Sequence, residues 1–172
     1  MLGRVAVGFL SAYSCNIQAT NEKTNTEMSA SAQVQGKEIT GTFHFFQAKY
    51  TSNTEITGEI RGLYPEKKHG LSIHDGSLEK PEKTFNPFGR KHGGPWNFER
   101  KVGDLGNIEA DKEGVGRYKI SEPYVKLSGP FSVLSKVITV HENPDDFAFG
   151  KTTESLETGA VGEILAKGVI TN

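Results

Sequence analysis

Cysteine is nearly absent from this chain of 172 residues, because Cys15 is the only one. A lone thiol excludes an intrachain disulfide. It also excludes the paired cysteines with which proteins bind Cu(I). No Asn-x-Ser/Thr sequence is present, so the chain has no acceptor site for asparagine glycosylation.

Long helical periodicity and an excess of one charge are absent too. The 20 Lys and Arg residues are balanced by 21 Asp and Glu residues, with no basic block. This balance argues against a partner that is nucleic acid or an anionic membrane surface. What is present is 20 Gly, 10 Phe and short apolar runs separated by Gly, Pro, Asn and Asp. This composition is typical of an all-β sandwich or barrel.

The first twenty residues differ in composition from the rest. Arg4 precedes the apolar run 5–10, and small residues follow it. We predict a signal peptide over 1–19, a flexible segment over 20–27 and one domain over 28–172. The expected location is therefore secreted. If residues 5–10 are an ordinary N-terminal strand, a cytoplasmic location is the alternative, since the run is too short to span a membrane.

Alternation of apolar and polar side chains predicts about eight antiparallel strands. In residues 70–74, Leu71 and Ile73 are expected in the core, which turns Ser72 and His74 to the opposite face. The predicted strands cover 28–34, 39–46, 55–61, 70–74, 107–110, 116–120, 137–141 and 166–170.

Two long loops, 75–104 and 142–163, interrupt the strand pattern. Loops of this length in a compact domain are usually functional. Three motifs lie in the first loop or cross its end: FNP at 85–87, RKHGGP at 90–95 and VGDLGN at 102–107. These motifs closely resemble the metal-binding loop of copper/zinc superoxide dismutases, and the similarity extends over residues 31–170. The resemblance implies an eight-stranded antiparallel Greek-key β-barrel.

Copper in this family is bound by histidines, because the metal changes oxidation state without dissociating. The family segment reads His-Gly-x-His-x-His, whereas this chain reads HGLSIH at 69–74. The resemblance therefore places Ser72 at the first copper-ligand position and His74 at the second. His141 matches the third, and Thr84 stands where one histidine is shared by both metals. The alternative for His74 and His141 is that they are ordinary histidines of the outer face.

The zinc positions are similarly incomplete. By resemblance, His92 and Asp104 match zinc ligands, whereas Thr84 and Lys101 replace the other two. The Lys101 ammonium is expected to repel a dication and to pair with Asp104 or another carboxylate. The alternative for His92 and Asp104 is that they remain only as hydrogen-bond partners within the loop.

Two further residues match positions that support the metal ligands in the family. These are His69 and Asp145, of which the second links copper and zinc histidines through hydrogen bonds. Asp145 is therefore expected to orient His92. A turn or a helix cap is equally compatible with an Asp in this sequence.

The positions that guide superoxide have also changed. The family holds the anion with an arginine beside copper, but this chain has Ile164 there, and Glu157 replaces a lysine of the preceding loop. With Glu154 and Glu163 nearby, the rim is expected to repel an anion. No catalytic residue of the family is left intact by this comparison.

We therefore expect a superoxide-dismutase-like protein without efficient dismutase activity. It is expected to act by binding a protein partner or a second copy of itself, or by weak copper or zinc binding, with no cofactor at full occupancy. The alternative is a divergent copper-dependent dismutase that uses His74, His141 and a substitute such as His69 or His44. A copper chaperone is disfavoured, because the thiol motifs that such proteins use are missing.

Overall fold

The structure is a computed structural model that describes residues 26–172. The predicted signal peptide, 1–19, and most of the predicted flexible segment, 20–27, lie outside the described residues. None of the helices in residues 26–172 has the length and apolar content needed to cross a membrane.

The described residues form nine strands and a short helix. Eight strands were predicted, and the ninth is the short β5, which lies inside the predicted loop 75–104. The elements are β1 (Met28–Gly36), β2 (Thr40–Gln47), β3 (Thr54–Arg61), β4 (Lys68–Gly76), β5 (Pro81–Thr84), β6 (Asp104–Glu109), β7 (Val115–Glu122), β8 (Val137–His141), α2 (Thr153–Thr158) and β9 (Ile164–Val169).

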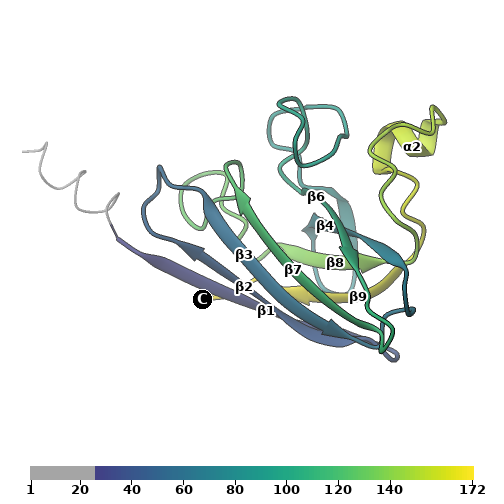
Figure 1. Cartoon of the computed structure of the whole chain (residues 1–172). Helices are drawn as coiled ribbons and strands as arrows, with labels where there is room; N and C mark the ends of the chain where they lie inside the picture. The colour runs from purple at the N-terminus through teal and green to yellow at the C-terminus, as the bar shows by residue number, and fades with distance from the viewer. Residues whose placement is uncertain (1–25) are drawn as a thin grey trace, which may run out of the picture.

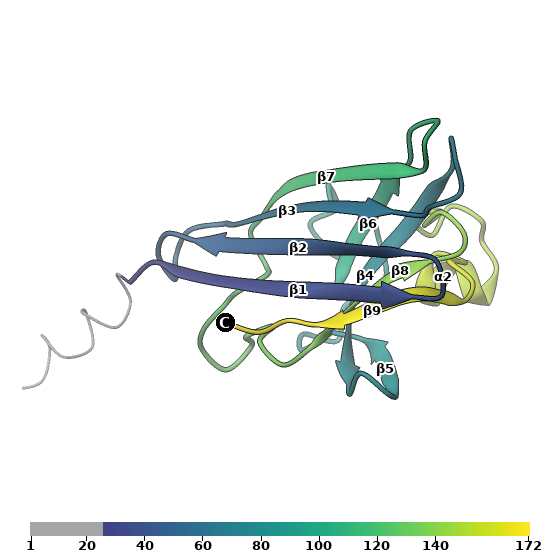
Figure 2. The ribbon, with the colours of Figure 1, turned by 90° about the horizontal axis from the view of Figure 1, so that it is seen from below.

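The strands form one antiparallel sheet in the order β5-β4-β8-β9-β1-β2-β3-β7, with β6 paired to β4. The sheet curls into a barrel-like shape, with β1, β2, β3 and β7 forming a layer in front of β4 and β8 (Figures 1 and 2). A tight turn joins β6 to β7, with Gly114 at a φ of +74° and the Asp111 carboxylate accepting from the amide of Val115. The all-β barrel expected from the sequence is confirmed.

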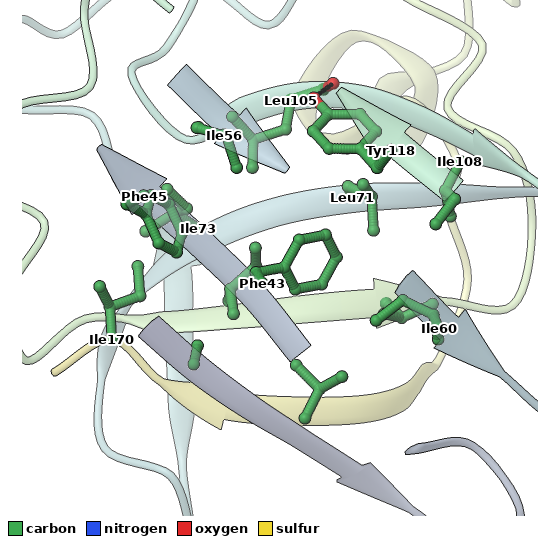
Figure 3. Close-up of a cluster of buried hydrophobic side chains, with 14 of the residues drawn as sticks. Phe43, Phe45, Ile56, Ile60, Leu71, Ile73, Leu105, Ile108, Tyr118 and Ile170 are labelled. Carbon is green, nitrogen blue, oxygen red and sulfur yellow. Dashed lines mark hydrogen bonds between the residues drawn. The ribbon is translucent and has the colours of Figure 1, made fainter. Parts of the chain in front are cut away.

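The core lies between the two layers (Figure 3). Phe43 and Phe45 of β2 are 0% and 1% exposed, and Ile56 and Ile60 of β3 are 0% exposed. These residues alternate with exposed polar residues along each strand. Because successive side chains of a strand point to opposite faces, one face of each strand packs on the core and the other is solvated.

Strands β4 and β8 are buried on both faces, unlike β2 and β3. Leu71 and Ile73 of β4 point into the core, as predicted, while Ser72 and His74 are only 8% exposed on the outer face. The outer face is therefore covered by the long loops. Polar side chains that elsewhere would face water are enclosed there.

A buried ion pair ties the first long loop to the barrel. The guanidinium of Arg100, which is 1% exposed, contacts the carboxylate of Glu122 on β7. It also donates to the carbonyl oxygens of Pro95 and Asp104, each over 3.1 Å, and lies 4.9 Å above the ring of Tyr124. Arg100 thus connects both ends of the loop segment 95–104 to one strand.

Candidate metal centre

Strand register brings most of the predicted site positions together beneath the loops. His74 pairs with Thr84 across β4 and β5, and Ser72 pairs with Asp104 across β4 and β6. His141 ends β8, the other neighbour of β4. Each of these side chains is at most 8% exposed.

His74 presents one free ring nitrogen. Its Nδ1 donates to the carbonyl oxygen of Glu82 over 2.8 Å, which leaves a lone pair on Nε2. Nε2 is buried and has no hydrogen-bond partner in the described part of the chain. Burial lowers the pKa of His74; the bond to Glu82 opposes this effect, and the charge of Lys101 adds to it. The ring is therefore neutral at neutral pH.

One ring nitrogen of His141 is already occupied. Its Nε2 lies 2.9 Å from the hydroxyl oxygen of Thr139, and its ring centroid is 5.6 Å from that of His74. Burial and the nearby His74 lower the pKa of His141 to about 4, so the ring is neutral. Nε2 is engaged whether it donates its proton to the hydroxyl or accepts the hydroxyl proton. We did not predict the role of Thr139, although its i, i+2 spacing to His141 places both on one face of β8.

His92 is bonded to a carboxylate at each ring nitrogen. Nδ1 lies 2.9 Å from Oδ1 of Asp104, and Nε2 lies 2.8 Å from Oδ1 of Asp145. Burial lowers the pKa of His92, but the hydrogen bonds and negative charges of the two carboxylates outweigh it and raise the pKa to about 9. The ring is therefore an imidazolium at neutral pH, and it joins the two long loops. The expected contact between Asp145 and His92 is present.

The expectation that Lys101 pairs with a carboxylate is wrong. Oδ2 of Asp104 accepts from the backbone amides of Gly93 and Lys101, so this carboxylate is engaged by the backbone. The Lys101 ammonium extends instead to the carbonyl oxygen of Glu157. Carbonyls in the last turn of a helix have no partner within the helix and attract cations. No carboxylate of residues 26–172 pairs with this ammonium.

Helix α2 brings its C-terminal end against the His92–Asp145 bond. The helix begins after Thr152, whose side chain accepts from the amide of Ser155, and ends at Gly159 with a φ of +75°. A Cβ atom on Gly159 would lie 2.0 Å from Oδ1 of Asp145 and 2.6 Å from Nε2 of His92. A side chain at this position would therefore break the hydrogen bond between His92 and Asp145, which joins the two loops.

Neither proposed substitute ligand replaces the missing histidines. His69 is 0% exposed, and its Nδ1 donates to the carbonyl oxygen of His141 over 2.8 Å. Its Nε2 has no partner in the described part of the chain, but the spacing of His69 places it on the face of β4 that carries Leu71 and Ile73, opposite Ser72 and His74. His44 is exposed on β2, which is not a neighbour of β4 or β8 in the sheet.

The rim of the site is apolar and acidic. Ile164 pairs with His141 across β8 and β9, so the position expected for an anchoring arginine does lie beside this histidine. Ile164 is 36% exposed, and three exposed glutamates precede it, Glu154 and Glu157 on α2 and Glu163 next to β9.

These donors do not fit the two metals that the resemblance implies. Zinc needs four ligands, or three and a water, but both nitrogens of His92 and both oxygens of Asp104 are used within the protein. For copper, two buried imidazole nitrogens are free in residues 26–172, Nε2 of His74 and Nε2 of His69. Only His74 is on the face of β4 that carries Ser72, because His69 alternates with Leu71 and Ile73 on the other face. No group of three or more His, Cys, Asp or Glu side chains in residues 26–172 is arranged to hold a metal ion.

The raised pKa of His92 predicts a dependence of stability on pH. An ordinary histidine has a pKa of 6.5, so protonation of His92 stabilises the folded state fully below pH 6.5, and this stabilisation is lost as the pH rises to about 9. The difference between these two pKa values corresponds to on the order of 3 kcal/mol in the free energy of unfolding. Urea unfolding in the presence of a chelator, at pH values below and above this range, measures the loss of stability. The His92→Gln variant should lack this part of the pH dependence, and equal dependence in both proteins would contradict the assignment.

Comparison with known proteins identifies the family. Residues 39–170 match the family model described as copper/zinc superoxide dismutase (SODC). A Cu-Zn superoxide dismutase from Paramecium bursaria Chlorella virus 1 is 39% identical over 148 residues, or 83% of this chain and 78% of the relative. An extracellular Cu-Zn superoxide dismutase from Brugia pahangi is 38% identical over 90% of this chain and 79% of the relative. The Cu-Zn superoxide dismutase from Saccharomyces cerevisiae is 36% identical over 77% of this chain and 89% of the relative. The chain therefore belongs to the copper/zinc superoxide dismutase family.

Proposed function

We propose that this chain does not dismutate superoxide efficiently and acts by binding, either to a protein partner or weakly to copper or zinc. The main support is that the atoms positioned to hold metal are used in hydrogen bonds within the protein. In the described part of the chain, two buried imidazole nitrogens are free, Nε2 of His74 and Nε2 of His69, and of these only His74 shares a face of β4 with Ser72.

The chemistry of dismutation supports the same proposal. The reaction needs a group that is alternately reduced and oxidised, and hydroxyl and ammonium side chains at Ser72, Thr84 and Lys101 do not hold copper in both states. An apolar residue at position 164 offers no charge to bind superoxide. Exposed glutamates on the rim slow the approach of an anion.

A superoxide-decay assay tests this proposal. The protein is incubated with copper and zinc and then desalted. Superoxide should disappear no faster in its presence than in buffer with the same residual metal. The matched positive control is the variant Ser72→His, Thr84→His, Lys101→His and Ile164→Arg, which restores the missing groups. A rate constant near the diffusion limit, about 10⁹ M⁻¹s⁻¹, in the natural chain would overturn the proposal.

A second candidate is a divergent copper-dependent dismutase, as the names of the relatives suggest. The observation that favours it is the pair of neutral rings of His74 and His141, whose centroids are 5.6 Å apart. Such a pair is a weak copper site, in which Thr139 competes for one nitrogen.

The variant Thr139→Val tests this second candidate. It removes the hydroxyl with little change in volume, so Nε2 of His141 becomes free and copper affinity should rise by up to about tenfold. A copper titration of both proteins, with the variant His74→Ala as the control that removes the free donor, measures the change. If all three proteins have the same affinity, copper binds elsewhere on the chain.

Secretion is part of the proposal and rests on the composition of residues 1–19, together with the name of the extracellular relative. Mass analysis of the protein from its natural source tests it, because a cleaved chain begins after Ser14 or Ala19. A chain that retains residues 5–10 would contradict secretion by this route.

A further inference from the structure

A groove outside the metal centre has the properties of a ligand site. It has a volume of about 730 Å³ and lies against β6 and β7, between the loop that contains Trp96 and the loop that contains Phe147. These loops rise from the same side of the barrel (Figure 1). Grooves of roughly 300–1,000 Å³ hold small molecules. None of the predicted copper-type residues lines it.

One wall of the groove is aromatic and open to solvent. The rings of Trp96 and Phe147 meet edge to face with centroids 4.6 Å apart, and Phe149 lies 6.4 Å beyond. Trp96 is 64% exposed and Phe149 is 72% exposed. Large aromatic side chains are costly to expose together, and such patches mark binding sites.

The backbone that presents this wall is strained. Phe147 and Ala148 have φ values of +58° and +66°, a region that side chains other than glycine rarely adopt. Asp145 and Asp146 hold them there, because their carboxylates accept from the amides of Phe147 and Ala148 over 2.7 and 3.0 Å. Strain that is maintained in this way clusters at binding sites.

A free cation faces the same groove. Lys119 on β7 lines it and has no ion-pair partner in the described part of the chain. The other two cations that line it are already shared: Lys68 is 3.7 Å from Glu109, and Arg117 contacts Glu59 and Asp111. The groove therefore combines an aromatic wall with one unpaired positive charge.

We propose that this groove binds a flat, apolar small molecule that bears one anionic group. The flat part packs on Trp96 and Phe147, and the anion pairs with Lys119. Asp145 borders both this groove and His92, but none of the metal-ligand positions lines the groove, so the proposal does not depend on the proposed loss of dismutase activity.

Fluorescent probes test the proposal on the full chain. Anilinonaphthalene sulfonate has a flat apolar body and one anionic group, and N-phenylnaphthylamine is its uncharged analogue. Trp96 is the only tryptophan of the chain, so energy transfer from its emission to a bound probe reports binding beside it. We expect saturable transfer to both probes, at one probe per chain, with tighter binding of the sulfonate.

Two variants separate the wall from the charge. Phe147→Gly removes the ring at a φ that suits glycine, so the fold is retained. It should weaken the binding of both probes by about tenfold or more. Lys119→Glu should weaken binding of the sulfonate by roughly tenfold and leave binding of the uncharged probe unchanged. The control is Phe131→Ser, which alters a second exposed aromatic pair, Phe88 and Phe131. It should change the affinity of neither probe.

Three results would overturn the proposal. They are absence of energy transfer from Trp96, equal loss of binding in the Phe131→Ser control, and equal weakening of both probes by Lys119→Glu. Cooperative thermal unfolding of each variant confirms that the probes report on folded protein.

Discussion

Replacing Thr84 and Lys101 together by histidine will raise the zinc affinity of this protein by about a hundredfold or more. If the predicted zinc positions are correct, the double variant completes a set of four zinc ligands with His92 and Asp104, and it removes an ammonium that is expected to repel a dication. His92 then exchanges a carboxylate partner for the metal. Competition with a chelating dye gives the affinity, and the melting temperature with and without zinc gives the stabilisation.

The control for this experiment is Thr84→Ser with Lys101→Gln, which removes the same positive charge but adds no ligand. It should gain little zinc affinity. If the histidine variant gains no more than this control, the loops differ from the structure described here, and the assignment of the zinc positions fails.

Breaking the buried pair of Arg100 and Glu122 will lower the free energy of unfolding by roughly 3–5 kcal/mol. Arg100→Met leaves a carboxylate that is 1% exposed without its partner, and it also frees the carbonyls of Pro95 and Asp104. Urea unfolding measures the loss. The effect is large because neither group can reach water in the folded protein.

An exposed pair provides the matched control. Arg61 contacts Glu59 over 2.6 Å, but its side chain is 64% exposed, so Arg61→Met should cost at most about 1 kcal/mol. The double variant Arg100→Met with Glu122→Leu should be more stable than Arg100→Met alone, because it leaves no buried charge. Similar losses at Arg100 and Arg61 would contradict the burial argument.

The barrel could be predicted from the sequence because most of its strands alternate apolar and polar side chains. Leu71 and Ile73 are in the core and Ser72 and His74 are on the other face, as their alternation indicates. The strand β5 was missed, because four residues, PEKT, show no such alternation. The register of β4 with β5, which places His74 beside Thr84, depends on pairing between strands rather than on local pattern.

Motifs predicted which residues lie together beneath the loops and the contact of Asp145 with His92, but not most of the other hydrogen bonds there. The bond between Thr139 and His141 depends on a rotamer, and the contact of Lys101 with Glu157 joins residues 56 positions apart. The link from His92 to two carboxylates depends on both long loops folding over β4. Such contacts follow from tertiary packing, which neither alternation nor spacing specifies.

Metal analysis of protein purified without added metal, together with anomalous scattering from its crystals at the copper and zinc edges, tests the central claim most directly. The account predicts far less than one copper and one zinc per chain and no ordered peak between His74 and His141. One copper per chain, ligated by both of these histidines at full occupancy, would contradict it.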